Sequence, residues 1–226
     1  MGAEKKTREI LEEVRGKRGY LLTHHEFFGF ADPAMLEKYD QVYEHLTLKE
    51  KFLEDRVKEF VWLGILAAVY EEAGGPIHIK RAKEAGLTDQ EIAEVFLLTQ
   101  VAQGFDVVSF TRDKWGRLIP GVDLLEAYGL FIDQMAARSG IPARIIELIL
   151  IGVYAALAKG RALRFHLGRA NEHGLKDEEI YEAISYILLP CGAPTLIQAA
   201  EVLKEALARG ELKPSSAFKD WLAAMS

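Results

Sequence analysis

The sequence contains one cysteine, Cys191, among its 226 residues. A single thiol cannot close an internal disulfide, and it cannot by itself supply the paired thiols of a redox motif or a zinc site. The N-terminal stretch MGAEKKTREILEEVRGKRGY also lacks the apolar segment of a secretory signal. Together these absences favour a reducing compartment, and we expect a cytoplasmic protein.

Positive charge is also scarce. The chain has 28 Lys and Arg residues against 34 Asp and Glu residues, for a net charge of −6. It therefore lacks the basic excess that binding to a phosphate backbone requires, so we expect no nucleic-acid partner. The longest apolar runs, at 60–70 and 148–158, fall short of the roughly 18 to 20 residues that span a bilayer, so we expect no membrane partner. The hydrophobic share of 50% is enough for a buried core.

An internal repeat is present at an offset of about 88 residues. The segment HIKRAKEAGLTDQEIAE at 78–94 aligns without a gap to HLGRANEHGLKDEEIYE at 166–182, with roughly ten of 17 positions identical. The alignment extends backwards to pair Gly64 with Gly152, and forwards to pair Gly104 with Gly192. With one inserted residue, MLEKY at 35–39 matches LLEAY at 124–128. The chain is therefore a tandem duplication.

The periodicity within each repeat is helical. IIELILIGVYAALA is almost continuously apolar, which indicates a central buried helix, and the following segments place apolar residues three or four positions apart. Thr88 and Glu91 form a capping-box signature. No alternating strand pattern of useful length occurs, so the predicted class is all-α. We expect an N-terminal extension at 1–30, repeats at 31–115 and 116–210, a tail at 211–226, and a connection between the repeats over 111–122.

Two Glu–His pairs recur at one spacing. Glu59 precedes His78 by 19 residues, and Glu147 precedes His166 by the same number. Two helices joined by a short turn would bring each carboxylate to its imidazole. A histidine with a carboxylate partner can hold a proton at neutral pH and donate it to a carbanion. The pairs therefore predict proton transfer, and the alternative is a pair of buried polar groups that only satisfy each other.

These features in this order resemble the carboxymuconolactone decarboxylase and AhpD-like alkylhydroperoxidase superfamily. The resemblance is closest over ARIIELILIGVYAALAKGRALRFHLGRANEHGLKDEEI. It implies an all-helical fold, and it implies a homo-oligomer because single-repeat members assemble as trimers or hexamers. If single-repeat relatives close rings of six repeats, a tandem chain would form a trimer.

Hydroperoxidase-like members of this superfamily carry Cys-x-x-Cys seven and four residues before the histidine. The corresponding positions are Lys159 and Ala162 in the second repeat, and Glu71 and Gly74 in the first. Peroxide reduction needs an attacking and a resolving thiol, so a thiol peroxidase is disfavoured. An isolated Cys191 is typical of small core filler.

Missing thiols together with retained histidines favour the decarboxylase branch. There the resemblance implies a carboxylated lactone or keto acid from the degradation of aromatic compounds, with no cofactor. His166 would donate the proton with Glu147 as its partner, and His78 with Glu59 would form the corresponding pair of the first repeat. Loss of CO2 leaves a dienolate that the enzyme must stabilise and protonate.

Three arginines surround His166 in the sequence and suit the binding of a small carboxylate: Arg161, Arg164 and Arg169. They favour the second repeat as the working site. Alternatively, they form a solvated face or contact a neighbouring subunit.

Other assignments stay open. His24 and His25 are adjacent and lack the i, i+4 spacing of a helical metal site, so we expect no metal. Within enzymology, an isomerase or a lactone hydrolase could use the same scaffold. A non-catalytic oligomer that binds a small acid is a further alternative, because the surroundings of the two histidines differ.

Overall fold

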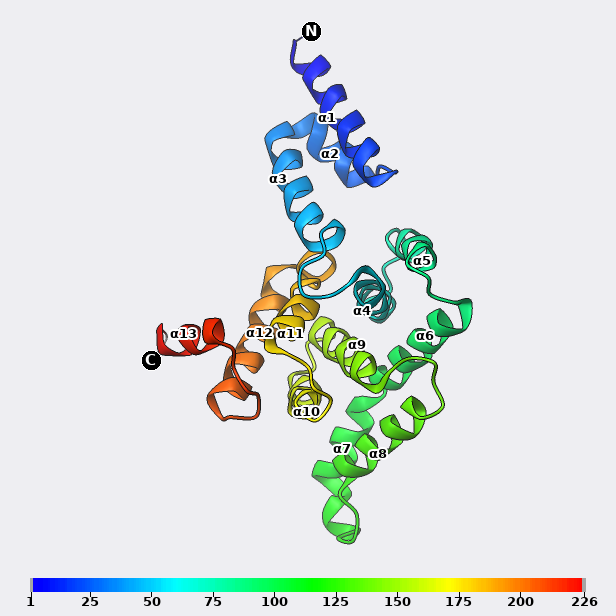
Figure 1. Cartoon of the computed structure of the whole chain (residues 1–226), viewed down its shortest axis with the longest axis vertical. Helices are drawn as coiled ribbons and strands as arrows, with labels where there is room; N and C mark the ends of the chain where they lie inside the picture. Colours follow the sequence, from blue (N-terminus) through cyan, green and yellow to red (C-terminus); the bar gives the residue numbers. More distant parts are fainter. Residues whose placement is uncertain (1, 225–226) are drawn as a thin grey trace. The chain divides into compact units, whose positions relative to one another are not determined.

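The computed structural model describes residues 2–224, with side chains from residue 7 onward, and over this range the fold is all-α (Figure 1). The chain divides into two compact units, Met1–Lys49 and Glu50–Ser226. The first unit contains α1 (Gly2–Arg18), α2 (Thr23–Ala31), α3 (Pro33–Tyr43) and the π-helix η1 (Glu44–Leu48). The second contains α4 (Asp55–Ala68), α5 (Gly75–Glu84), α6 (Asp89–Gln103), α7 (Phe105–Trp115), the 3-10 helix η2 (Gly116–Leu118), α8 (Leu124–Ala136), α9 (Ala143–Ala156), α10 (Gly160–Ala170), α11 (Asp177–Ser185), α12 (Leu188–Ala208) and α13 (Ser216–Ala224).

The first unit is a small bundle of α1, α2 and α3. Its apolar centre consists of Ile10, Leu11, Val14 and Leu36. Asp32 ends α2 and begins α3, where its side chain accepts a hydrogen bond from the backbone N–H of Met35 at 3.2 Å. Such capping satisfies one of the backbone donors left free at a helix start.

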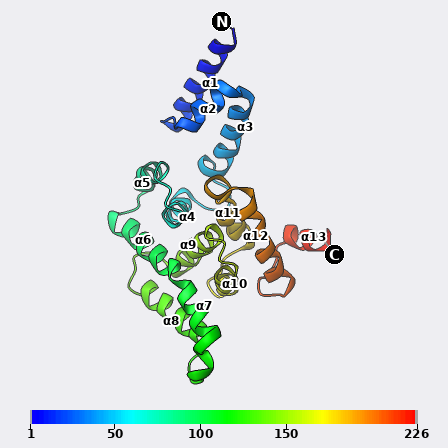
Figure 2. The same ribbon diagram turned by 180° about the vertical axis from the view of Figure 1, so that it is seen from behind.

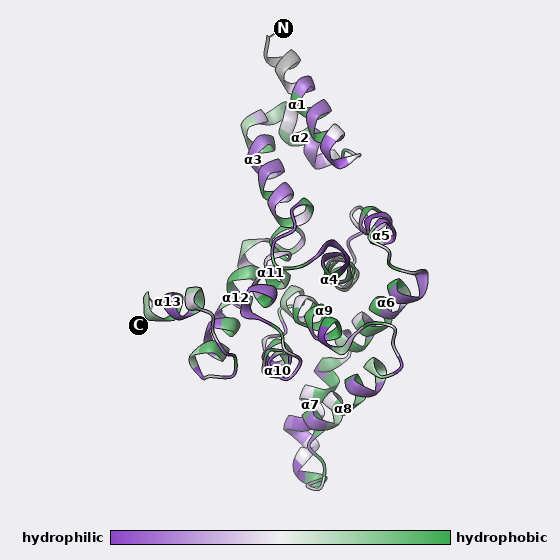
Figure 3. Cartoon of the chain, in the orientation of Figure 1, coloured by the Kyte–Doolittle hydropathy of each residue, from purple (hydrophilic) through white to green (hydrophobic). Residues whose placement is uncertain are grey.

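The second unit is built around α4 and α9, which pack against each other. Helices α5 and α6 pack on α4, whereas α10, α11 and α12 pack on α9, an arrangement that can be followed from both sides in Figures 1 and 2. Hydrophobic residues run along α9, while α1 and α3 are largely hydrophilic (Figure 3). The predicted central helix of the second repeat is therefore confirmed as the buried α9.

The contact between α4 and α9 is centred on one glycine from each repeat. A Cβ atom at Gly64 would lie 2.9 Å from a methyl group of Ile149, and one at Gly152 would lie 2.9 Å from a methyl group of Val61. The same offset of about 88 residues relates Gly64 to Gly152 and Val61 to Ile149. The two repeats thus meet through equivalent surfaces, and only glycine allows the helices to come this close.

Two equivalent glutamates join the repeats a second time. Glu94 of α6 accepts hydrogen bonds from the Ser139 hydroxyl at 2.6 Å and the Gly140 N–H at 3.1 Å, just before α9 begins. Glu182 of α11 accepts them from the N–H groups of Phe52 at 2.8 Å and Leu53 at 3.0 Å, just before α4 begins. Each repeat therefore holds the loop that leads into the central helix of the other.

Helix α7 extends to Trp115, so the first five residues of the expected connection over 111–122 are helical. No helix breaker occurs before Gly116, and Thr111 donates its hydroxyl hydrogen bond back to the Val107 carbonyl at 2.7 Å. Its polar side chain is thereby accommodated within the helix.

The helical stretch Asp89–Leu118 is long and apolar enough to cross a bilayer by length and composition alone. In the structure it consists of α6, α7 and η2, and α6 ends at Gln103 before α7 begins at Phe105. Val95, Leu98 and Ala102 of α6 are core residues. A core helix of a globular protein passes the same composition test, so the stretch is weak evidence for a membrane span.

Candidate functional site

The Glu–His pair of the second repeat forms where α9 and α10 pack together. Helix α9 ends at Ala156, Ala158 adopts a left-handed conformation with φ of 53°, and α10 begins at Gly160. This short turn brings Glu147 to His166, with 2.7 Å between Oε2 and Nδ1. His166 has no exposed surface in the chain and Glu147 has 1%. The repeated spacing of 19 residues therefore predicted a contact that the structure contains.

Glu147 lies between two cationic or potentially cationic partners. Its Oε2 faces His166, and its Oε1 accepts a hydrogen bond from Nε of Arg169 at 2.8 Å. Burial raises the pKa of Glu147, but the hydrogen bond from His166 and the charges of His166 and Arg169 outweigh it, so the pKa of the carboxyl is lowered overall. The carboxylate is therefore ionised at neutral pH and acts as an acceptor for Nδ1–H.

Two tyrosine hydroxyls complete the site on the opposite side of the imidazole. The hydroxyl of Tyr128, from α8, lies 3.1 Å from Nε2 of His166 and 2.5 Å from the hydroxyl of Tyr154, from α9. The Tyr154 ring also stacks on the His166 ring, with centroids 5.1 Å apart and planes at 20°. Burial raises the pKa of both phenols, so both hydroxyls keep their protons at neutral pH.

The corresponding pair of the first repeat has different surroundings. His78 Nδ1 lies 2.8 Å from Glu59 Oε2, which repeats the first contact. The His78 ring, however, stacks on Trp62 with centroids 4.8 Å apart, and Trp62 stacks on Tyr186 at 4.9 Å. By the repeat alignment, Leu66 stands where the second repeat has Tyr154. Both imidazoles thus pack against aromatic rings, and that of the second repeat also contacts a hydroxyl.

The three predicted substrate-binding arginines lie in different places. Arg169 belongs to the site, where it contacts Glu147 and also Asp133. Arg161 binds the Asp113 carboxylate and the Ser109 hydroxyl of α7, both at 2.7 Å. Arg164 binds Glu211 and lies 3.6 Å from Glu205. All three guanidinium groups are therefore paired with carboxylates, and a role for Arg161 or Arg164 toward a substrate stays a prediction.

The positions that hold thiols in hydroperoxidase-like relatives have other uses here. Lys159 Nζ donates to the Gln103 carbonyl at 2.8 Å and lies 3.1 Å from Asp106. In the first repeat, Glu71 accepts a hydrogen bond from the Gly74 N–H and so closes the turn before α5. Cys191 is partly buried on α12, and burial raises the pKa of its thiol, which makes it a weak nucleophile at neutral pH.

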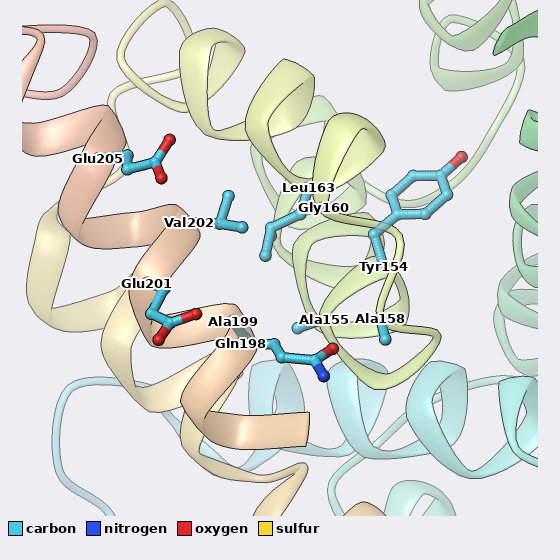
Figure 4. A pocket seen from close by; sticks show the side chains of 10 residues that line it. All are labelled: Tyr154, Ala155, Ala158, Gly160, Leu163, Gln198, Ala199, Glu201, Val202 and Glu205. Carbon is cyan, nitrogen blue, oxygen red and sulfur yellow. The ribbon is translucent and has the colours of Figure 1, made fainter. Parts of the chain in front are cut away.

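A cavity of about 250 Å³ lies between α9, α10 and α12 (Figure 4). Glu201 and Glu205 line its α12 side, and the Tyr154 ring points away from them. The carboxylates would repel an anionic ligand. This cavity therefore does not suit a small carboxylate.

In the first unit, the two adjacent histidines make contacts of their own. His25 accepts a hydrogen bond at Nδ1 from the Leu22 N–H at 2.9 Å. Burial, with the nearby charge of Arg18, lowers the pKa of His25 to about 3. His24 Nε2 lies 3.2 Å from the hydroxyl of Tyr39, the residue that aligns with Tyr128. Both imidazoles thus contact groups of their own bundle.

The sequence pattern did not single out Tyr128 or Tyr154 as site residues. A signal for Tyr128 was present, because the matched segments MLEKY and LLEAY both end in tyrosine. A tyrosine that occurs at the same position in both repeats was therefore a candidate for the site. In the second repeat it lies four residues before Ile132, a buried residue of α8. Nothing in the pattern distinguishes Tyr154 from its apolar neighbours on α9.

Comparisons with known proteins give the family. The sequence model described as the carboxymuconolactone decarboxylase family matches residues 33–112 and again 123–205. No curated protein matches this chain.

Among solved structures, the chain is similar to a protein of Burkholderia xenovorans LB400, provisionally assigned as a gamma-carboxymuconolactone decarboxylase subunit. The TM-score is 0.62 at 20% identity, and the match covers 90% of this chain and 98% of the other. At this identity the likeness shows the fold.

Proposed function

The chain belongs to the carboxymuconolactone decarboxylase family, and on this premise we propose that it is a decarboxylase of a small carboxylated lactone or keto acid. The site in the second repeat carries out the reaction with protein side chains alone. The observation that carries the proposal is the buried array in which an ionised Glu147 holds His166 and a neutral hydroxyl contacts its other nitrogen.

The proposed reaction needs a proton at one carbon. Breaking the bond to the carboxyl group releases CO2 and leaves the electron pair delocalised into a conjugated carbonyl. The carbon then takes a proton, which the imidazolium of His166 supplies. Glu147 Oε2 lies 2.7 Å from Nδ1 of this ring and places a negative charge beside the proton donor. Burial strengthens the interaction, since the pair is held away from water.

Only the second repeat combines these elements. Its imidazole has a carboxylate on one nitrogen and a hydroxyl on the other, whereas His78 of the first repeat stacks on an indole. We therefore assign the chemistry to His166 and Glu147, and a structural role to His78 and Glu59.

A second candidate is a proton-transfer isomerase on the same site. It is favoured by the pairing of Arg169 with Glu147 and Asp133, because two carboxylates already neutralise the one predicted arginine that contacts Glu147. A substrate without a carboxylate would suit that charge balance. Product analysis separates the two candidates, because only decarboxylation releases CO2.

The test is CO2 release from a panel of carboxylated lactones and β-keto acids, measured with the wild type, His166→Ala and His78→Ala. We expect His166→Ala to lower the rate at least about 100-fold, the usual contribution of a general acid. His78→Ala is the matched control, and we expect it to retain activity. Full activity of His166→Ala would contradict the assignment, and isomerised products without CO2 would favour the second candidate.

A further inference from the structure

Every side of the His166 ring is occupied by protein. Glu147 contacts Nδ1, and the Tyr154 ring stacks on one face of the imidazole. The rings of Phe165 and Tyr128 meet it edge-on, with angles of 89° and 86° between their planes and that of the imidazole. Within the described part of the chain, Tyr128 is the residue that reaches Nε2. This hydroxyl therefore lies where a ligand would have to approach Nε2.

The hydrogen-bond directions around Tyr128 follow from the charge of Glu147. Because the ionised carboxylate accepts from Nδ1–H, Nε2 of a neutral His166 is an acceptor, so Tyr128 donates to it. The Tyr128 oxygen then accepts from the Tyr154 hydroxyl. When His166 is protonated, Nε2–H donates to the Tyr128 oxygen instead, and the proton of Tyr128 becomes free to leave.

We propose that Tyr128 is the catalytic residue that exchanges the proton with the ligand, and that His166 and Glu147 recharge it. This inference rests on the proposed function and deepens it, because it moves the point of contact with the substrate from the imidazole to the phenol. It also explains how His166 can take part in proton transfer although none of its surface is exposed.

The step balances without a co-reactant. After CO2 has left, the carbanionic carbon takes the phenolic proton of Tyr128, and the Tyr128 oxygen takes the proton from Nε2 of the imidazolium. One C–H and one O–H bond form while one O–H and one N–H bond break, and His166 ends neutral. Burial raises the pKa of Tyr128, which disfavours a free phenolate and favours a concerted transfer of both protons.

The position of Tyr128 suits this role better than that of Tyr154. Tyr154 lies on the central helix α9 with no exposed surface, and its ring stacks on the imidazole. Tyr128 lies on α8, which packs on α7 and α9, and it keeps 6% of its surface exposed. Tyr154 is therefore a positioning residue that orients the Tyr128 hydroxyl by a 2.5 Å hydrogen bond.

The experiment compares Tyr128→Phe with Tyr39→Phe, the same change at the aligned position of the first repeat. The readouts are CO2 release from the panel and the dependence of the rate on the fraction of D2O. We expect Tyr128→Phe to lose at least about 100-fold in rate and Tyr39→Phe to stay within about threefold. The wild type should show a curved dependence on D2O, as two transferred protons require, and Tyr154→Phe should lose less rate than Tyr128→Phe.

A second measurement needs no substrate. The nitrogen NMR shifts of His166 report whether Nε2 accepts a hydrogen bond, and they should change in Tyr128→Phe and not in Tyr39→Phe. Unchanged shifts, or a Tyr128→Phe enzyme as fast as the wild type, would overturn the relay while leaving the His166 assignment intact. Failure of the proposed function would give a different result, because CO2 release would then survive the His166→Ala substitution.

Discussion

At the scale of single residues, helix geometry explains which predicted arginine joins the site. Successive residues of an α-helix are rotated by about 100°, so Arg169, three positions after His166, lies about 60° from it. Arg164 and Arg161 lie about 160° and 140° away, and both contact carboxylates on other elements. The spacing of these residues along the helix therefore already separates Arg169 from Arg161 and Arg164.

The Glu–His contacts could be predicted because both partners recur at one spacing. The hydroxyls could not be predicted with equal force, since Tyr128 reaches His166 from a helix 38 residues earlier. Contacts of that kind depend on how α8 packs, which no local pattern encodes.

Glu147 should make the stability of the second unit depend on pH. Its pKa is lowered in the fold, so its contribution is fully present above about pH 4.5 and is lost as the pH falls through the lowered value. We expect Glu147→Gln to lower the free energy of unfolding by about 1 to 3 kcal/mol at pH 7 and by less near pH 3. Urea unfolding at both pH values measures this, with the exposed Glu126→Gln as control. An equal loss at both pH values would argue against an ionised Glu147.

At the scale of helices, the aligned Gly64 and Gly152 both lie where α4 and α9 cross. The sequence showed that the glycines correspond, but it could not show that they face each other, because that needs the packing of two helices far apart in the chain. The same holds for Glu94 and Glu182, whose matched positions gave no hint that each binds a loop of the other repeat.

Adding a methyl group at this crossing should be costly. A Cβ at Gly152 would lie 2.9 Å from Val61 and 3.2 Å from Ile65, and branched side chains on a packed helix have little room to yield. We expect Gly152→Ala to destabilise the protein by about 1 to 2 kcal/mol despite the better helix propensity of alanine.

The matched control is Gly168→Ala on α10, where a Cβ would meet nothing within 4 Å. We expect it to be neutral or to stabilise by up to about 1 kcal/mol. Thermal unfolding compares the two variants, and equal stability would mean that α4 and α9 can move apart without cost.

At the scale of the whole molecule, the compact units do not follow the repeats. By sequence α3 is the counterpart of α8, yet α3 belongs to the first unit and packs with α1 and α2. The buried residues of α3 are Leu36, Asp40 and Tyr43. They lie on the helix face that corresponds to the buried face of α8 in the second unit. The helical periodicity of the sequence predicted the fold class, whereas the packing partners of α3 come from the segment that precedes it.

Exposed apolar side chains on α7, η2 and α8 lead us to predict a homo-oligomer, with a trimer favoured. A surface of this kind is typical of a protein–protein contact; its members are Val107, Phe110, Trp115, Leu118, Leu130 and Phe131. We expect light scattering to give three times the mass of the chain, and Leu130→Glu to reduce it. Ile197→Glu, on α12, is the control and should not. A monomeric wild type would exclude the prediction.

The reciprocal binding of loops by Glu94 and Glu182 has an evolutionary consequence. In an ancestor with a single repeat, one glutamate would have made both contacts across the axis of a homodimer, so every substitution would have acted twice. Joining the two copies in one chain turned that axis into an internal one. Within one chain each copy can change alone, and here one histidine packs against tryptophan while the other has a hydroxyl partner.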